Sequence, residues 1–295
     1  MNALLRALAL VGALWSSAAC AQESVHPALY VARDADSTLY LFGTVHVRPP
    51  GVDWGDAAVR EAIEASDEVW TEIEISPEED ARAQALMREL STAPAGRPLS
   101  SWLTSEERGR FNALLGRLGV PVSYLDGMQP WAAGLTLTII PIMQAGYDPE
   151  SGVDRAVDAY AEARRKRMRA FETIEDQLGF LSGLSPELQH QMLLEAIDEA
   201  ELGPPMLADM SRAWERGDEA VLEQLVVEDT REDYPELYEV LFLRRNAQWI
   251  DTLMQELDGA GVDFVAVGAG HLVGEDGLVA QLRARGVAVE RVRSR

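Results

Sequence analysis

Two histidines of this chain stand in the same local sequence pattern. His46 ends the segment 41–46 (LFGTVH), and His271 ends the segment 266–271 (AVGAGH). In both segments, an apolar run is followed by a glycine, two further residues and the histidine. A glycine at the end of a strand lets the chain turn sharply, which presents the histidine just beyond the sheet. Open α/β folds bind their ligands at that edge, outside the carboxyl ends of the strands.

An acidic residue near the end of another predicted strand could complete a metal site. The alternating side chains of residues 68–75 predict a strand with Glu72 near its end. Two imidazoles and a carboxylate are ligands that catalytic divalent metals use, with positions left for water. Such a metal lowers the pKa of its bound water and polarises a carbonyl group, which leads to hydrolysis. In the alternative interpretation, the histidines are structural hydrogen-bonding groups. Glu74, on the same face as Glu72, is interpreted as a solvated strand end.

The elements that would position these residues are strands near both ends of the chain, with helices between them. Strands are predicted at 29–33 and 38–42, which form a hairpin, and at 68–75, 167–173, 263–267 and 287–292. Helices are predicted from 77, from 105, and at 54–65, 131–145, 154–165, 186–201, 206–216, 218–226, 234–257 and 276–285. The predicted fold class is α/β, with a mixed sheet formed by the N- and C-terminal segments and a large helical insertion between them.

The composition argues against several classes of protein. The 49 acidic residues against 26 basic ones give a net charge of −23 over 295 residues. Nucleic acids and anionic lipids are bound by clustered Lys and Arg, so we expect neither as a partner. The single cysteine, Cys20, excludes an intrachain disulfide and a cysteine-rich zinc site. The sequence has no Walker or Rossmann glycine pattern and no G-x-S-x-G segment, so nucleotide binding and serine hydrolysis have no support.

Residues 1–21 have the plan of a signal peptide. They contain Arg6 as the only charge, a short apolar run and small residues before Ala21. Cleavage after Ala21 would leave residues 22–295 as a single exported domain, periplasmic or secreted, with no transmembrane segment. The alternative is a lipoprotein that is acylated at Cys20. The sequence does not indicate an oligomeric state.

Two longer segments resemble the signature segments of a known family. Residues 39–46 (LYLFGTVH) and 268–278 (GAGHLVGEDGL) are similar to those of the TraB/GumN family, whose relatives include Tiki-type metalloproteases and pheromone-shutdown proteins. Residues 67–74 resemble the family strand that carries an acidic residue, which corresponds to Glu72. Further positions that resemble the family are Gly152, Val153, Asp154, Glu172, Thr173, Gln177, Arg245 and Asn246. The resemblance covers roughly residues 30–292.

The resemblance implies a divalent-metal-dependent peptidase. It nominates His46, His271 and Glu72 as metal ligands, and Mn²⁺, Co²⁺ or Zn²⁺ would each suit this mixture of nitrogen and oxygen atoms. It makes Glu172 a second acidic candidate, as a ligand or a general base. Arg245 would stabilise an oxyanion or orient a substrate carboxylate. The alternative for Arg245 is a salt bridge within a helical layer.

We therefore expect an exported metal-dependent hydrolase that acts on a peptide or protein, with Glu172 and Arg245 as its catalytic residues and Asp154 and Asn246 bracing the site. The alternative is a non-catalytic protein of the same family that sequesters a peptide or another partner. The two hypotheses differ in whether metal and turnover disappear together when His46 or His271 is removed.

Overall fold

The central element of the computed structural model, which describes residues 25–202 and 204–293, is a mixed β-sheet. Within these residues the sheet has six strands in the order β4-β3-β5-β2-β1-β6. The strands are β1 (Leu29–Arg33), β2 (Ser37–Thr44), β3 (Glu68–Thr71), β4 (Arg167–Ala170), β5 (Gly261–Gly268) and β6 (Ala288–Arg291). The predicted α/β class is confirmed, because segments from both ends of the chain form this sheet and helices occupy the sequence between them.

Four neighbouring strands of the sheet run parallel. Strands β2 and β3 both pair with β5, and β4 pairs with β3 in the same direction. Strand β1 forms the predicted antiparallel hairpin with β2. The turn is closed by the side chain of Asp34, which accepts hydrogen bonds from the backbone N–H groups of Asp36 and Ser37. The carboxyl ends of β4, β3, β5 and β2 therefore meet at one edge of the sheet.

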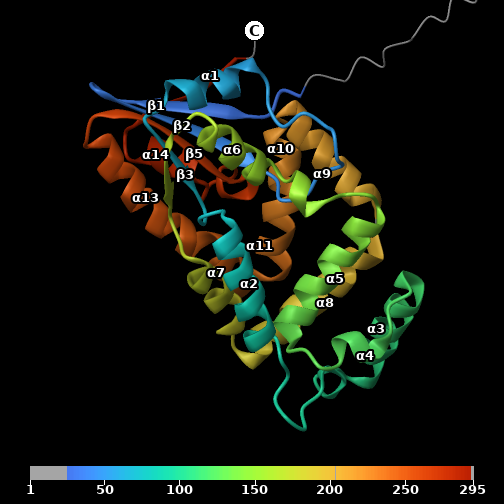
Figure 1. Ribbon diagram of the computed structural model, residues 1–295. Helices are drawn as coiled ribbons and strands as arrows, with labels where there is room; N and C mark the ends of the chain where they lie inside the picture. The colour runs from blue at the N-terminus through green and yellow to red at the C-terminus, as the bar shows by residue number, and fades with distance from the viewer. Residues whose placement is uncertain (1–24, 203, 294–295) are drawn as a thin grey trace, which may run out of the picture.

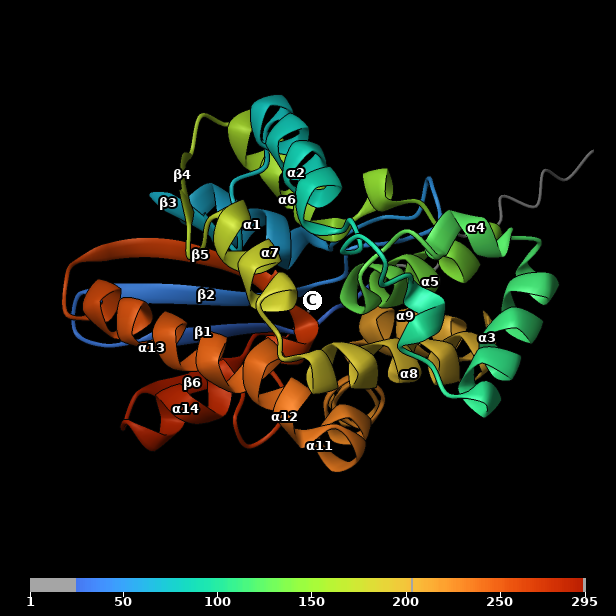
Figure 2. The same cartoon turned by 90° about the horizontal axis from the view of Figure 1, so that it is seen from below.

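Helices cover both faces of the sheet (Figure 2). One face packs against α1 (Ala57–Ala65) and α6 (Val153–Glu162), and the other packs against α13 (Arg244–Leu257) and α14 (Leu278–Ala284). Strand β2 alternates accordingly, since Leu39 and Leu41 pack toward α13 and α14 while Phe42 packs toward α1 and α6. A slip of one residue would turn each of these side chains to the wrong face, so apolar burial fixes the register.

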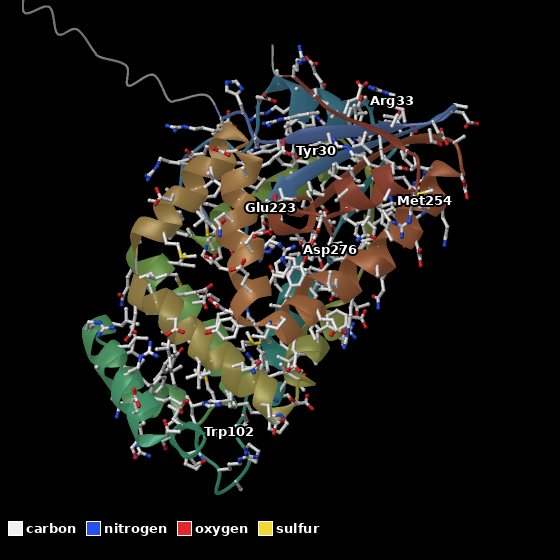
Figure 3. All side chains as sticks on the ribbon, turned by 180° about the vertical axis from the view of Figure 1, so that it is seen from behind. Tyr30, Arg33, Trp102, Glu223, Met254 and Asp276 are labelled. Carbon is white, nitrogen blue, oxygen red and sulfur yellow. The ribbon has the colours of Figure 1, made fainter. Side chains whose placement is uncertain are left out.

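The middle of the chain forms a helical part that extends away from the sheet (Figure 1). Its core lies between α3 (Ser105–Leu118), α5 (Pro130–Gln144) and α8 (Pro186–Leu202). Figure 3 shows Trp102 in this part, far from the sheet residues Tyr30 and Arg33. The other α-helices are α2 (Pro77–Leu90), α4 (Val122–Leu125), α7 (Ile174–Ser182), α9 (Pro204–Arg216), α10 (Glu219–Leu222), α11 (Asp229–Asp233) and α12 (Pro235–Tyr238). Short segments of other types are the 3₁₀ turns Leu99–Ser101, Pro149–Ser151 and Ala269–His271 and the π-helical segments Glu223–Glu228 and Glu239–Leu243.

The strand predicted at 68–75 is shorter than expected. It ends at Thr71, whose side-chain hydroxyl lies 2.8 Å from the backbone oxygen of Ile73 and 3.2 Å from that of Arg169. These contacts stabilise a turn that takes the chain out of the sheet. Glu72 therefore lies just beyond the strand and not within it, and the predicted alternation beyond Thr71 is wrong.

The strand predicted at 167–173 is also shorter and does not enter the core. It ends at Ala170 and lies at the edge of the sheet, with its side chains alternately exposed and half-buried. Thr173, which was predicted as part of this strand, instead caps the first turn of α7 by accepting a hydrogen bond from the backbone N–H of Asp176. The capping interaction competes with continuation of the strand.

The predicted signal peptide (1–21) and the candidate acylation site at Cys20 lie outside the described residues. The division into a signal peptide and a single domain at 22–295 therefore stays a prediction. Among the residues that the structure describes, no helix combines the length and the apolar character needed to cross a membrane.

Candidate active site

Each of the four parallel strands is followed by one residue that the sequence nominates. His46 follows β2, Glu72 follows β3, Glu172 follows β4, and His271 ends the 3₁₀ turn directly after β5. The last residues of these strands lie nearly opposite one another across the sheet. Residues that are far apart in the sequence are therefore brought together at one edge.

Gly268, the last residue of β5, lies where three of these side chains meet. A Cβ atom on Gly268 would be 3.1 Å from Oε1 of Glu72, 3.6 Å from Cδ2 of His271 and 3.9 Å from Nε2 of His46. The two imidazoles and the carboxylate therefore converge in space. A larger residue at position 268 would crowd Glu72, so glycine is needed here for close approach and not for an unusual backbone conformation.

The carboxylate of Glu72 is held by three hydrogen-bond donors. Oε1 accepts from the backbone N–H of Gly268 at 2.7 Å, and Oε2 accepts from Arg245 Nη2 at 2.6 Å and from Gln177 Nε2 at 3.1 Å. Burial raises the pKa of Glu72. The interaction with His271, which is protonated only at low pH, the charges of Arg245 and His46 and the bond from Gly268 outweigh burial and lower the pKa to about 2. Glu72 is therefore anionic at neutral pH.

Arg245, at the start of α13, is the central cation of this cluster. It donates to both oxygens of Glu172 over 2.9 to 3.2 Å, its Nη2 donates to Glu72, and its Nη1 lies 3.1 Å from Nε2 of His271. Trp249, one helical turn later, donates from Nε1 to Glu172 at 3.1 Å, and its ring lies 4.7 Å from the guanidinium carbon. Only 13% of the Arg245 side chain and 3% of the Glu172 side chain are exposed. Because these charges are largely buried, removing any one of them would leave its partner buried without a compensating charge.

His271 is buried and held in one orientation by Asn246. The amide nitrogen of Asn246 donates to the backbone oxygen of Asp276 at 3.0 Å, so its Oδ1 is the atom that faces Nδ1 of His271 at 2.7 Å. Nδ1 therefore donates to Asn246, and Nε2 carries the lone pair that faces Arg245. Burial, assisted by the positive charge of Arg245, lowers the pKa of His271 to about 3, so the ring is neutral at pH 7.

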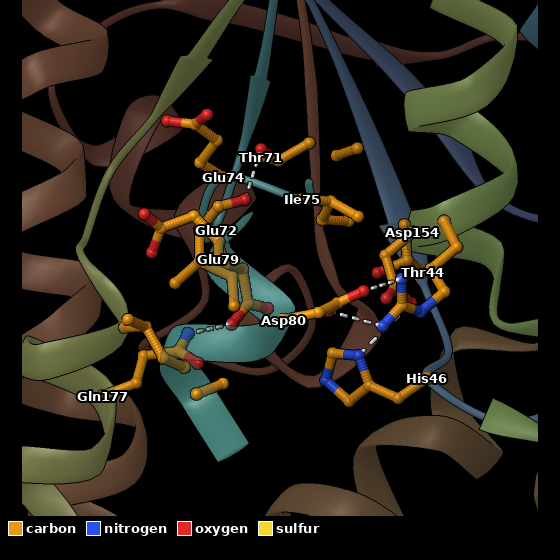
Figure 4. A pocket seen from close by; sticks show the side chains of 15 residues that line it. Thr44, His46, Thr71, Glu72, Glu74, Ile75, Glu79, Asp80, Asp154 and Gln177 are labelled. Atoms are coloured by element: carbon orange, nitrogen blue, oxygen red, sulfur yellow. Dashed lines mark hydrogen bonds and ion pairs between the residues drawn. The ribbon is translucent and has the colours of Figure 1, made fainter. Parts of the chain in front are cut away.

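His46 differs from His271 in exposure and charge. Its side chain is 67% exposed, and Nδ1 lies 3.2 Å from Oδ1 of Asp154 on α6 (Figure 4). Desolvation by the surrounding protein opposes the charged ring, but the hydrogen bond to Asp154 and the charges of Asp154 and Glu72 raise the pKa of His46 above its ordinary value. With Asp154 at Nδ1, the Nε2 atom is the one that lies near Gly268.

Part of the cluster borders a cleft of about 260 Å³, whereas His271, Arg245 and Glu172 lie behind its lining (Figure 4). His46 and Asp154 line one wall, and Glu72 and Gln177 line the opposite wall. Glu74 also lines the cleft and is exposed, as the interpretation of a solvated residue expects. The cleft is open to solvent, so a substrate can reach Glu72 and His46 together.

The donor set of His46, His271 and Glu72 fits a divalent metal in one respect and conflicts with it in another. Both imidazoles are held through Nδ1 by an oxygen atom, which directs Nε2 toward the cluster, as in metal-binding histidines. However, Nε2 of His271 and Oε2 of Glu72 both face the guanidinium of Arg245. In the part of the chain that the structure describes, no three His, Cys, Asp or Glu residues are grouped so that they could hold a metal ion. A metal here would require Arg245 to leave both groups, so the ligand assignment stays a prediction.

Two aromatic residues at the cluster were not singled out from the sequence. The ring centroids of Trp249 and Phe242 lie 4.4 Å and 5.2 Å from that of His271. The position of Trp249 could have been inferred, because residues four apart on a helix share a face and Trp249 follows Arg245 by four. Phe242 lies in the π-helical segment Glu239–Leu243, and that change of helical register has no recognisable signal in the sequence.

Comparison with known proteins identifies a family for this chain. The family model described as the TraB/PrgY/gumN family matches residues 28–291, which include all of the strands above and every residue of the cluster. No curated protein matches the sequence.

Proposed function

Because the chain belongs to the TraB/PrgY/gumN family, we propose that it is an exported metal-dependent hydrolase whose substrate is a peptide. The observation that carries this proposal is the convergence of His46, His271 and Glu72 around Gly268 at the carboxyl edge of the sheet. Two imidazole nitrogens and a carboxylate beside an open cleft are the arrangement that a catalytic divalent ion needs.

In this proposal, His46, His271 and Glu72 hold Mn²⁺, Co²⁺ or Zn²⁺. The ion would supply a Lewis acid and, at neutral pH, a nucleophile derived from water. Asp154 and Asn246 orient the two imidazoles through Nδ1, and such partners strengthen metal ligands. Metal binding has to remove the proton from His46, whose pKa is raised, so loading with metal is favoured at higher pH.

Arg245 and Glu172 act as a pair in this site. The guanidinium of Arg245 donates to both Glu172 oxygens, and the Trp249 indole donates to one of them. Glu172 therefore first holds Arg245 in place, and a role in proton transfer requires that pair to open. When Arg245 turns away from Glu72 and His271, its charge becomes available for the developing oxyanion or for a substrate carboxylate.

A non-catalytic, partner-sequestering protein is the second candidate, and one observation favours it. Arg245 already compensates the charges of Glu72 and Glu172 and binds the lone pair of His271, so the cluster is electrostatically satisfied without any metal. A network of this kind can serve structure alone. In that case the exposed cleft would bind a peptide without cleaving it.

Metal content separates the two candidates. The mature wild-type protein, His46→Ala and His271→Ala are exposed to Mn²⁺, Co²⁺ and Zn²⁺, desalted and analysed for bound metal, with circular dichroism to check the fold. We expect about one ion per chain in the wild type and none in the two variants. The matched control is His190→Ala, because His190 lies on α8 and contacts Glu107, away from the cluster.

A peptide-library screen on the loaded wild type then tests hydrolysis. Cleavage that is lost with the metal in both cluster variants supports the proposal. Absence of an ion from the wild type under all three conditions, or retention of the ion by His46→Ala and His271→Ala, would overturn the metal-hydrolase proposal. A loaded protein that binds peptides but cleaves none would favour the sequestering protein.

A further inference from the structure

A second hollow continues from the cleft along α6. This groove has a volume of about 490 Å³, and Ile75, Asp80 and Arg155 line both it and the cleft. Its walls come from the segment before α1, the start of α2 and one side of α6. A peptide whose scissile bond lies beside Glu72 would therefore place a neighbouring side chain in this groove.

Asp158 on α6 is the unusual residue of the groove. It lines the groove, yet only 8% of the residue is exposed. Within the described residues its carboxylate makes no hydrogen bond or ion pair with another side chain or with the backbone, although the charge of Arg155 acts on it from a distance. A carboxylate that is nine-tenths buried and has no partner is costly, and a cation bound in the groove would supply the missing charge.

The charged residues around Asp158 favour a cationic ligand in the groove. Glu150 and Glu162 also line the groove, and Arg155 is the basic residue among the lining side chains. Both Nη atoms of Arg155 already donate to Asp80, at 3.2 and 2.8 Å. Burial and the nearby charge of Glu162 raise the pKa of Asp158 to about 6, so the carboxylate is mostly ionised at pH 7 or above.

The remaining wall of the groove is apolar. Trp54, Ile75 and Pro77 line it on the side of α1 and α2. A long aliphatic stem that ends in a cation matches a groove with an apolar wall and a buried carboxylate. Lysine and arginine side chains have this chemistry, whereas acidic side chains would be repelled.

We propose that the groove is a specificity subsite for a basic residue of the peptide substrate, with the carboxylate of Asp158 as its anchor. This inference rests on the proposed function and names the class of substrate. It assigns Asp158 to substrate binding and not to the chemical step. A lysine or arginine near the scissile bond would pair with Asp158 while its methylene groups lie against the apolar wall of the groove.

Binding can be measured without turnover. The Glu72→Gln variant, with its fold checked by circular dichroism, is titrated into fluorescein-labelled pentapeptides that differ only in a central lysine, norleucine or glutamate. Norleucine keeps the aliphatic stem of lysine and removes its charge. We expect the lysine peptide to bind at least about tenfold more tightly than the norleucine peptide, and the glutamate peptide to bind most weakly.

A second substitution tests the anchor. Adding Asp158→Asn should reduce the difference between the lysine and norleucine peptides to about twofold or less, because Asn keeps the shape and removes the charge. Glu162→Gln is the matched control, since it removes one charge from an exposed residue of the same groove and should leave most of the preference. The lysine and norleucine comparison is also made in the unsubstituted protein with chelator present, so the test does not depend on the variants folding.

The outcomes separate this inference from the proposed function. Equal affinity for the lysine and norleucine peptides, or a preference for lysine that Asp158→Asn leaves intact, would overturn the subsite even if the wild type cleaves peptides. A preference for lysine that depends on Asp158 supports the subsite even if the wild type cleaves none of the peptides and the hydrolase proposal fails.

Discussion

Arg245 Nη1 lies 3.1 Å from Nε2 of His271, the atom that the metal hypothesis requires as a ligand. The same guanidinium also holds Glu72 at 2.6 Å. An arginine therefore lies where a divalent ion would share the same two partners. Under the metal hypothesis the two cations would compete for one position, and the first prediction below tests that competition.

Removing Arg245 should increase metal affinity and decrease stability. Arg245→Gln frees His271 and Glu72 but leaves two largely buried carboxylates without their cation, which costs about 3–5 kcal/mol in the free energy of unfolding. Denaturant titrations with and without Mn²⁺, Co²⁺ or Zn²⁺ test this. A bound ion should restore part of the lost stability in Arg245→Gln, and should have less effect in the wild type. A variant that is destabilised equally with and without metal would contradict the competition.

Asn246 should control metal affinity without touching the ion. Asn246→Ala leaves the Nδ1–H of the buried His271 without an acceptor, which costs about 1–3 kcal/mol of stability. Metal affinity should fall about 10- to 100-fold, as for other residues that orient a ligand. Isothermal titration with Zn²⁺ measures it. Gln248→Ala, exposed on the same helix, should behave as the wild type. An unchanged affinity in Asn246→Ala would argue that His271 is structural.

Gly268→Ala should damage the site more than the fold. The added methyl group would lie 3.1 Å from Oε1 of Glu72, so that carboxylate has to shift by a few tenths of an ångström. We expect the loss of stability to stay near 1–2 kcal/mol, while metal binding and any turnover fall by an order of magnitude or more. Gly109→Ala is the control, because its methyl group meets no atom within 4 Å on the helix α3. It should gain about 0.5–1 kcal/mol in thermal unfolding experiments. Full activity of Gly268→Ala would show that the three side chains need not meet there.

Glu195 on α8 should make stability depend on pH. Burial, with the charge of Glu199, raises its pKa to about 7 even though Thr230 donates a hydrogen bond to it. The folded state therefore retains this proton to higher pH than the unfolded chain, whose glutamate titrates near 4.5. The stabilising contribution is fully present below pH 4.5 and is lost as the pH rises to about 7.

The variant Glu195→Gln isolates that contribution. Above pH 8 the half-buried Glu195 of the wild type is charged, so the variant should have the larger free energy of unfolding, by on the order of 1–2 kcal/mol. Near pH 4 the two proteins should be equally stable. Urea denaturation at both pH values gives the two differences. Glu187→Gln, exposed on the same helix, should show neither. A constant difference between the wild type and Glu195→Gln at both pH values would contradict the shifted pKa.

Export predicts a defined N-terminus. Protein recovered from the periplasm or the medium should begin at Gln22, because cleavage is expected after Ala21. N-terminal sequencing and intact mass measure this. A mass increased by acyl chains at Cys20 would instead identify a lipoprotein, and recovery of the full chain from the cytoplasm would contradict export.

The sequence predicted that both histidines follow strands, but it did not predict the interactions that they make there. The shared glycine and histidine pattern of His46 and His271 predicted two strands with histidines at the same edge, and β2 and β5 are indeed neighbours. That prediction succeeded because period-two apolar runs and a terminal glycine are local signals. The insertion of Arg245 between Glu72 and His271 is not local. It depends on how α13 packs on the sheet. The sequence therefore could not decide whether Arg245 forms an ion pair or has a catalytic role.

Other features were missed for physical reasons that can be named. Strand β3 ends at Thr71, whose hydroxyl contacts the backbone oxygens of Ile73 and Arg169, and the alternating pattern up to residue 75 does not reveal this. The groove at Asp158 requires α6 to lie beside the start of α2, a tertiary arrangement without a sequence signal. On its own helix, Asp158 resembles one more charged residue in an acidic protein.

The order of the strands also determines when the sheet can be completed during synthesis. Strand β5 lies between β3 and β2 although it is translated long after both, and it carries Gly268 and leads directly to His271. During synthesis the early strands have to wait, unpaired at that position, until nearly the whole chain has emerged. A chain truncated before β5 would lack one histidine and the middle of its sheet at once. The strand that completes the sheet therefore also completes the cluster, and both form only after β5 has been synthesised.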